Sequence, residues 1–182
     1  MGMAAPIYYT AEMVRGLPDD SNRYEAVHGE LLVTPAPRAW HQIILARLFR
    51  ALDEYLRRNP VGHVLWSPAD ISWSPDTLVQ PDLFVVPMEE LRTLDWARMR
   101  RLLLVVEVVS PTTARADRFT KRRLYQEAGI PAYWIVDPDQ QLVEEWTPNT
   151  ALPAIARERV EWLPPGATEP FVLFVAELFR AV

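Results

Sequence analysis

The 182-residue sequence contains no cysteine, which excludes disulfide bonds, thiol nucleophiles and zinc sites built from cysteine. It has only three histidines, and they do not follow the HExxH spacing of a histidine-based zinc site. No apolar stretch approaches the roughly 20 residues that a membrane span requires, and the chain does not start with a basic region followed by an apolar run. We therefore expect a cytoplasmic protein with no membrane partner.

Positive charge is also scarce. The formal net charge is -5 at pH 7, and of the 19 lysines and arginines only Lys121 is a lysine. A protein that coats nucleic acid by bulk attraction needs a broad excess of positive charge to neutralise phosphates, so this mode of binding is not expected. A nuclease remains compatible with the composition, because a bound Mg²⁺ makes an acidic site attractive to phosphate.

Hydrophobic residues make up 49% of the chain, which is typical of a packed globular protein. The simplest organisation is one domain over residues 1–182, because no repeat or linker divides the sequence. The order of strand and helix patterns predicts an α/β fold, in which a central mixed sheet is flanked by two helices and carries peripheral hairpins. The expected helices lie at 7–20, 40–58, 115–128 and 175–180, the strands at 64–66, 71–73, 78–86, 102–109 and 159–163, and the hairpins at 23–34 and 133–146.

Two acids lie in apolar strand patterns. Glu107 interrupts the apolar run 102–109, and Asp82 directly precedes Leu83 in another run. An unpaired buried carboxylate costs several kcal/mol, so each acid needs a positively charged partner. If the two strands pair, both acids can converge on one divalent cation, which prefers oxygen ligands. A turn or capping role for Asp82, and neutralisation of Glu107 by a buried arginine, are the alternatives.

The only lysine lies on the apolar stripe of the predicted helix 115–128. Lys121 shares this stripe with Asp117, Leu124 and Tyr125, so it is expected to face the sheet. An ammonium beside two metal-binding carboxylates can orient the attacking water and stabilise charge that develops on a phosphoryl group. The alternative is an ordinary pair with Asp117 four residues earlier, worth only about 0.3 kcal/mol.

These residues resemble a known group of enzymes. Asp82, Glu107 and Lys121 are similar to the acid, acid and lysine of the PD-(D/E)XK nuclease superfamily, with Pro81 and Asp82 as the first pair. The wider sequence resembles the Uma-type putative restriction endonuclease family of bacterial proteins. The matching segments are 24–31, 34–35 with His41, 67–70, 80–82, 106–111, 118–125 and 133–137.

The resemblance implies a restriction-endonuclease-like core and a Mg²⁺- or Mn²⁺-dependent endonuclease. Asp82 and Glu107 would hold the metal, joined by Glu30 as an acid from an early element and by the backbone carbonyl of Val108. The superfamily lysine follows the second acid by two residues, but that position is Val109 here. The resemblance therefore implies that Lys121 takes this role from the helix.

The resemblance also implies a nucleic-acid substrate, with DNA preferred over RNA. Arg118 and Arg122 are expected to contact the phosphate backbone, and His41 is expected to be a phosphate-side or structural residue. A solvated helix face is the alternative for the arginines. A homodimer would suit a duplex substrate. The other functions compatible with the sequence are a catalytically silent nucleic-acid-binding or toxin-antitoxin-like module and a purely structural oligomerisation domain.

Overall fold

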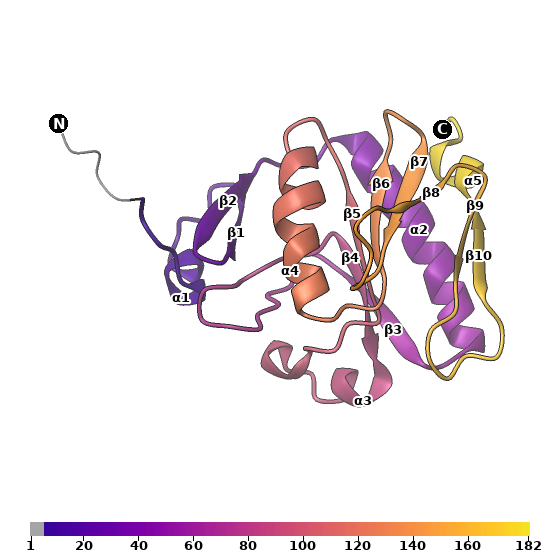
Figure 1. Cartoon of the computed structure of the whole chain (residues 1–182), viewed down its shortest axis with the longest axis horizontal. Coiled ribbons are helices and arrows are strands. Elements are labelled where there is room, and N and C mark those ends of the chain that lie inside the picture. The colour runs from indigo at the N-terminus through magenta and orange to yellow at the C-terminus, as the bar shows by residue number, and fades with distance from the viewer. Residues whose placement is uncertain (1–5) are drawn as a thin grey trace.

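A six-stranded mixed sheet with helices on both faces forms the centre of the protein (Figure 1), as seen in a computed structural model that describes residues 6–182. The strand order is β3-β4-β5-β6-β7-β8, and only β5 and β6 run parallel. The strands are β3 (Gly62–Trp66), β4 (Leu83–Pro87), β5 (Leu104–Val108), β6 (Tyr133–Asp137), β7 (Leu142–Trp146) and β8 (Ala154–Ala156). The predicted α/β fold with a central mixed sheet is thus confirmed.

Helix α2 (Ala39–Arg58) covers one face of the sheet. Its residues Ile44, Leu48 and Leu52 are almost fully buried, and they belong to one apolar core with Leu83 of β4 and other strand residues. The helical spacing of these apolar side chains explains why this segment forms a single long amphipathic helix. The prediction of a helix over 40–58 is confirmed.

The opposite face is covered by a helical segment with an unusual first half (Figure 1). Residues of the π-helical turn η2 (Ala116–Lys121) continue directly into α4 (Arg122–Glu127). Leu124 and Tyr125 pack on this face together with Val105 of β5. Side chains alternate along β5, so Glu107 lies on the same face as Val105 and therefore points toward η2 and α4.

The remaining elements are peripheral. They are α1 (Ala11–Arg15), β1 (Arg23–Val27), β2 (Glu30–Thr34), α3 (Met88–Leu91), the 3-10 turn η1 (Trp96–Arg98), β9 (Arg159–Trp162), β10 (Phe171–Phe174) and α5 (Val175–Phe179). The β1-β2 hairpin turns at Gly29, whose φ of 79° and close contact with the Tyr8 ring leave no room for a side chain. None of the helices formed by residues 6–182 is long and apolar enough to cross a membrane.

Two predicted strands differ from the structure. Residues 71–73 and the first part of 78–86 form only isolated bridges, from Ile71 to Val79 and from Leu78 to Ala26 of β1, and β4 begins at Leu83. Pro81 has no N–H to donate to a ladder, which accounts for the late start of β4. The backbone N–H of Gln80 instead donates a hydrogen bond to Oε1 of Glu25 at 2.8 Å. Strands β8 and β10 were not predicted.

Candidate active site

The two acids predicted from the strand patterns lie side by side. Strands β4 and β5 pair antiparallel with Leu83 opposite Val106, so Asp82 stands next to Glu107. The Asp82 N–H points to Glu107 Oε2 at 3.4 Å, and the Val108 N–H donates to Asp82 Oδ2 at 2.9 Å. Both acids are at least 95% buried. The pairing of two central strands therefore brings these carboxylates together.

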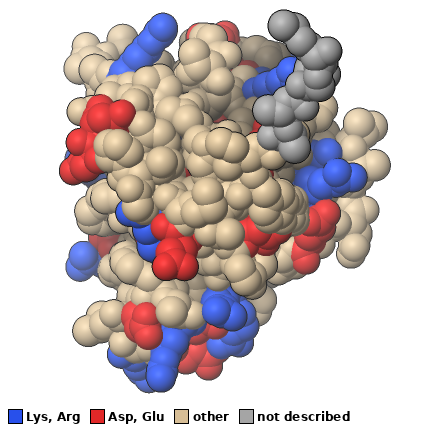
Figure 2. All heavy atoms as spheres, turned by 90° about the vertical axis from the view of Figure 1, so that its left-hand side faces the viewer, with Lys and Arg blue, Asp and Glu red and all other residues tan. Residues whose placement is uncertain are grey.

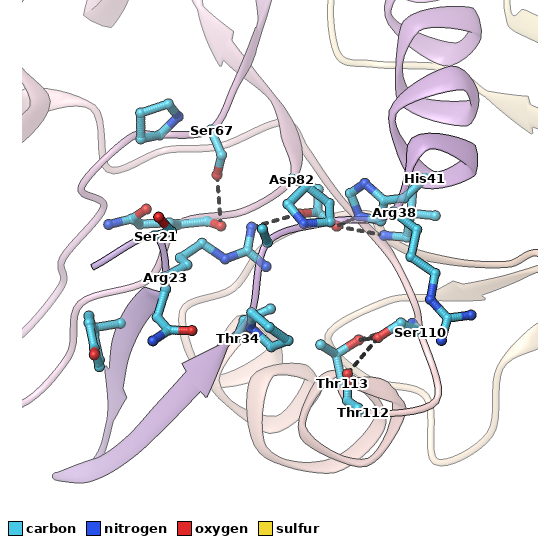
Figure 3. A pocket seen from close by; sticks show the side chains of 18 of the residues that line it. Ser21, Arg23, Thr34, Arg38, His41, Ser67, Asp82, Ser110, Thr112 and Thr113 are labelled. Carbon is cyan, nitrogen blue, oxygen red and sulfur yellow. Dashed lines mark hydrogen bonds and ion pairs between the residues drawn. The ribbon is translucent and has the colours of Figure 1, made fainter. Parts of the chain in front are cut away.

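Arg23 and His41 reach Asp82 from opposite sides (Figure 3). Nη1 of Arg23 donates to Oδ1 at 2.6 Å, and Nε2 of His41 lies 3.0 Å from Oδ2. Burial by itself would raise the pKa of Asp82, but the hydrogen bond from His41 and the positive charge of Arg23 outweigh burial and hold this pKa well below its usual range. Asp82 is therefore ionised throughout the physiological pH range.

Lys121 is surrounded by three carboxylates. Its Nζ donates to Glu107 Oε1 at 3.0 Å, and it lies 2.8 Å from Glu25 Oε2 and 3.4 Å from Asp117 Oδ1. The side chain is only 2% exposed. Burial would lower the pKa of Lys121, but the charges of Glu107, Glu25 and Asp117 outweigh burial and raise it. The Lys121 ammonium is therefore permanently charged. Its burial agrees with the prediction that Lys121 lies on the inward face of the helical segment.

The cluster carries more negative than positive charge. Its acids are Glu25, Asp82, Glu107 and Asp117, and its permanent cations are Arg23 and Lys121. When all four acids are ionised and His41 is neutral, the sum is two negative charges. Burial is the largest cause that raises the pKa of Glu107, while Lys121 opposes the rise and Asp82 adds to it. The cluster is therefore completed by bound protons or by an additional cation.

This excess charge predicts that stability in the absence of divalent ions falls as pH rises. Burial raises the pKa values of Glu107 and Asp117, so the folded protein keeps protons that the unfolded chain releases above its ordinary values of 4.5 and 3.8. The unfolding free energy then decreases with pH by up to about 1.4 kcal/mol per pH unit for each retained proton. The lowered pKa of Asp82 has the opposite effect. Ionised Asp82 stabilises the folded protein, and this stabilisation is lost only as pH falls below 3.8.

We expect melting temperatures in a chelating buffer to fall from pH 5 to pH 8, and Asp117→Asn to make this fall shallower. A stability that is flat or increasing over this range would show that the cluster holds no excess of buried negative charge.

The donor set fits a divalent cation. Carboxylate oxygens are the ligands that Mg²⁺ and Mn²⁺ prefer, and a doubly charged ion would balance the two excess charges. Oε2 of Glu25 is buried and has no hydrogen-bond donor among the described residues, although it is ion-paired with Lys121. Among residues 6–182, no three acidic or histidine side chains are already arranged around one metal position. Asp82 and Glu107 are the adjacent pair that would hold the ion.

The cluster borders an open pocket of about 790 Å³ through Asp82. Arg23, His41 and Asp82 line it, whereas Glu107 and Lys121 do not and are almost fully buried. Trp66 also lines the pocket and is more than half exposed. Among the acids of the cluster, Asp82 is therefore the one that a molecule in the pocket can contact, with Glu107 and Lys121 behind it.

The structure does not bring Glu30 to this cluster. Glu30 pairs with Val27 at the turn end of the hairpin, its side chain is exposed, and it lines a separate depression with Arg115 and Phe119. Glu25, in the middle of β1, is the early acid that reaches Lys121. The backbone of Val108 is at the site through its N–H, and a role for its carbonyl stays a prediction.

Arg23 and Glu25 were not predicted as site residues. The sequence signal for them is the alternation of side chains along β1. It puts Arg23, Glu25 and Val27 on one face of the strand, and two of these three residues are charged. The third member, Val27, is almost fully buried, so this face could not be solvent-exposed along its whole length.

The predicted phosphate contacts of Arg118 and Arg122 find no support in the geometry. Arg118 bonds to Asp137 at 2.5 Å and to Glu144 at 2.6 Å. Arg122 lies over the Trp146 ring at 4.7 Å and bonds to the Arg118 carbonyl. Neither arginine lines the pocket. Arg118 ties the helical segment to β6 and β7, and Arg122 packs it against Trp146 of β7.

We expect Arg118→Ala to lower the unfolding free energy by about 2 kcal/mol, because it leaves two largely buried carboxylates unpaired. Binding of an oligonucleotide should not change. Thermal unfolding and fluorescence anisotropy measure the two quantities, and Arg115→Ala, at an exposed arginine of the same segment, is the matched control. A weakened oligonucleotide affinity with unchanged stability would restore the phosphate role of Arg118.

The outer surface gives little support for broad electrostatic binding. Figure 2 shows the face that carries the β1-β2 hairpin, and the described residues on it mix acidic and basic side chains without forming one basic patch. This distribution agrees with the net charge of -5. Recognition of an anionic molecule is therefore expected inside the pocket.

Comparisons with known proteins show the fold and the family of the chain. The chain has the fold of a protein from Anabaena variabilis ATCC 29413, described as a putative nuclease belonging to DUF820, with a TM-score of 0.77, 20% identity, and coverage of 94% of this chain and 97% of that one. At this identity the likeness shows the fold alone. No curated protein matches the chain in sequence. The sequence profile of Uma2, described as putative restriction endonuclease, matches residues 11–176, which include all the acids and cations of the cluster. The chain therefore belongs to the Uma2 family.

Proposed function

We propose that the protein is an endonuclease that uses Mg²⁺ or Mn²⁺ to hydrolyse a phosphodiester bond, with DNA as the preferred substrate. The observation that carries this proposal is the convergence of Asp82, Glu107 and Lys121, with Asp82 lining an open pocket. Two further facts support it: membership of a family described as putative restriction endonuclease, and a fold shared with a protein described as a putative nuclease.

In this proposal Asp82 and Glu107 are the carboxylates that hold the ion, and Glu30 is not included. A bound divalent ion supplies Lewis acidity and lowers the pKa of water. Glu107 keeps its orientation because Lys121 and the Tyr125 hydroxyl both donate to Oε1, at 3.0 and 3.1 Å. Its other oxygen, Oε2, is left facing Asp82.

Lys121 has two roles in the proposal. It offsets part of the negative charge of Glu107 and Glu25, with which it forms buried ion pairs at 3.0 and 2.8 Å. It also places a permanent positive charge behind the carboxylates, where it stabilises negative charge that develops on the phosphoryl group. The contact with Asp117, at 3.4 Å, is the longest of its three ion pairs. It is the contact that Lys121 gives up most readily to orient a water molecule.

Cleavage assays with purified protein test the proposal. Supercoiled plasmid, single-stranded DNA and RNA are incubated with Mg²⁺, with Mn²⁺ or with a chelator. We expect cleavage of DNA that requires the divalent ion, and weaker cleavage of RNA. The absence of cleavage, together with no divalent-ion binding in calorimetry at millimolar concentration, would overturn the proposal.

A catalytically silent nucleic-acid-binding module is the second candidate. The observation that favours it is the position of Arg23, which already neutralises Asp82 without a metal. This reading predicts that oligonucleotides bind in the presence of a chelator as tightly as with divalent ions. Anisotropy measurements under the two conditions separate the candidates, because the endonuclease should bind more tightly when the divalent ion is present.

A further inference from the structure

Arg23 lies in the pocket wall and binds one of the two carboxylate oxygens of Asp82. Its Nη1 lies 2.6 Å from Oδ1, while Oδ2 is bound by the Val108 N–H and by His41. Both carboxylate oxygens are therefore engaged in this structure (Figure 3). A divalent ion that binds Asp82 at Oδ1 competes with the guanidinium for the same oxygen.

Arg23 makes fewer ion pairs than the other buried cation and is more exposed. Its Nε is buried without a hydrogen-bond partner among the described residues and lies 3.8 Å from Glu25 Oε2. The side chain is 20% exposed and lines the pocket, whereas Lys121 is 2% exposed and contacts three carboxylates. Arg23 is thus the cation that can leave the cluster.

The element that carries Arg23 is separate from the element that carries Asp82. Arg23 begins β1, which pairs with β2 in a two-stranded sheet and makes one isolated bridge from Ala26 to Leu78, whereas Asp82 leads into β4 of the central sheet. A rotation of the long Arg23 side chain into the pocket breaks no strand pairing. It does break the ion pair with Asp82, and that loss is offset if another cation takes its place.

We propose that Arg23 is a displaceable counter-ion, which closes the Asp82 site in the metal-free protein and binds a substrate phosphate once a divalent ion has replaced it. This inference rests on the proposed function. The cluster has two excess negative charges with Arg23 in place and three without it, so removal of the guanidinium strengthens binding of a divalent ion. A released guanidinium faces the pocket, and its planar fork suits the paired oxygens of a phosphate. Metal binding and phosphate binding thereby promote each other.

Calorimetry with Mn²⁺ tests the first half of this proposal. We expect Arg23→Gln to bind Mn²⁺ about tenfold more tightly than the wild-type protein, because one unit of repulsion near the ion is removed. Arg23→Lys keeps the charge and should stay within about twofold of wild type. Arg15→Gln is the matched control, since Arg15 lines the same pocket but pairs with Asp70. Circular dichroism establishes that each variant is folded.

Oligonucleotide binding in Ca²⁺ tests the second half. Arg23→Gln should weaken this binding about tenfold, and Arg23→Lys should weaken it by a smaller factor, because lysine lacks the guanidinium fork. Unchanged or weaker Mn²⁺ binding by Arg23→Gln, with Mn²⁺ bound by the wild type, would overturn this inference alone. Unchanged oligonucleotide binding by Arg23→Gln would overturn the proposal that Arg23 moves from Asp82 to a substrate phosphate. If the wild type and Arg23→Gln both fail to bind Mn²⁺, the proposed endonuclease function fails as well.

Discussion

Asp82→Asn is expected to lower the rate of DNA cleavage by at least about 1000-fold, or about 4 kcal/mol. Asp82 is the acid of the cluster that lines the pocket, and the variant replaces a charged oxygen ligand by a neutral amide. The loss of one negative charge also weakens the attraction for a divalent ion. Steady-state cleavage of plasmid and Mn²⁺ calorimetry measure the two effects, and both should be lost together.

The matched control is Asp70→Asn. Asp70 lines the same pocket and is partly exposed, but it contacts Arg15 and Gln80 and none of the cluster residues among the described part of the chain. This variant should retain cleavage within about twofold of wild type. Full activity of Asp82→Asn would reject the assignment of Asp82 as a metal ligand.

Lys121→Met is expected to lower cleavage by about 100- to 1000-fold and to destabilise the protein by about 3 kcal/mol or more. Methionine fills a similar volume but leaves Glu25, Glu107 and Asp117 without their shared cation. Because carboxylates without a cation can be protonated, the loss of stability should be smaller at pH 5 than at pH 8. Chemical unfolding at the two pH values and cleavage by the folded variant are the measurements.

Arg123→Met controls for the loss of a positive charge on the same helical segment. Arg123 is 76% exposed and has only a long contact with Glu127, at 3.7 Å. Its activity and stability should be close to those of wild type. If Lys121→Met keeps full activity, Lys121 is a structural counter-ion and has no part in catalysis.

The main features of the candidate site could be inferred from burial arguments. Glu107 lies in an apolar run, so a partner was required, and strand pairing supplied Asp82 as its neighbour. The spacing of Asp117 and Lys121 predicted that both face the sheet, and both are buried although their turn is π-helical. A local pattern was sufficient here because each inference concerned one element or two paired strands.

The contacts of Arg23 and Glu25 could not be inferred in the same way. Arg23 and Asp82 are 59 positions apart; Arg23 lies in the two-stranded sheet and Asp82 directly precedes a strand of the central sheet, and no sequence period reports how the two sheets pack. The same limit explains the difference between the two early acids. Glu25 pairs with Leu32 in the middle of the hairpin and faces inward, whereas Glu30 lies at the turn and stays in solvent.

Arg118 illustrates a related limit. A run of basic residues on a helix has the same sequence pattern whether the side chains bind phosphate or neighbouring acids. The acids that decide the matter, Asp137 and Glu144, belong to a hairpin beyond the helix. Only the packing of η2 against β6 and β7 reveals that the arginine is already paired.

A crystal structure of the protein with Mn²⁺ tests the central claim most directly. The anomalous signal of manganese identifies the ion independently of activity. The proposed site predicts one strong anomalous peak within about 2.3 Å of carboxylate oxygens of both Asp82 and Glu107, with Arg23 turned away from Oδ1. Crystals with saturating Mn²⁺ that show no peak between these two carboxylates, and Arg23 still bound to Asp82, would contradict it.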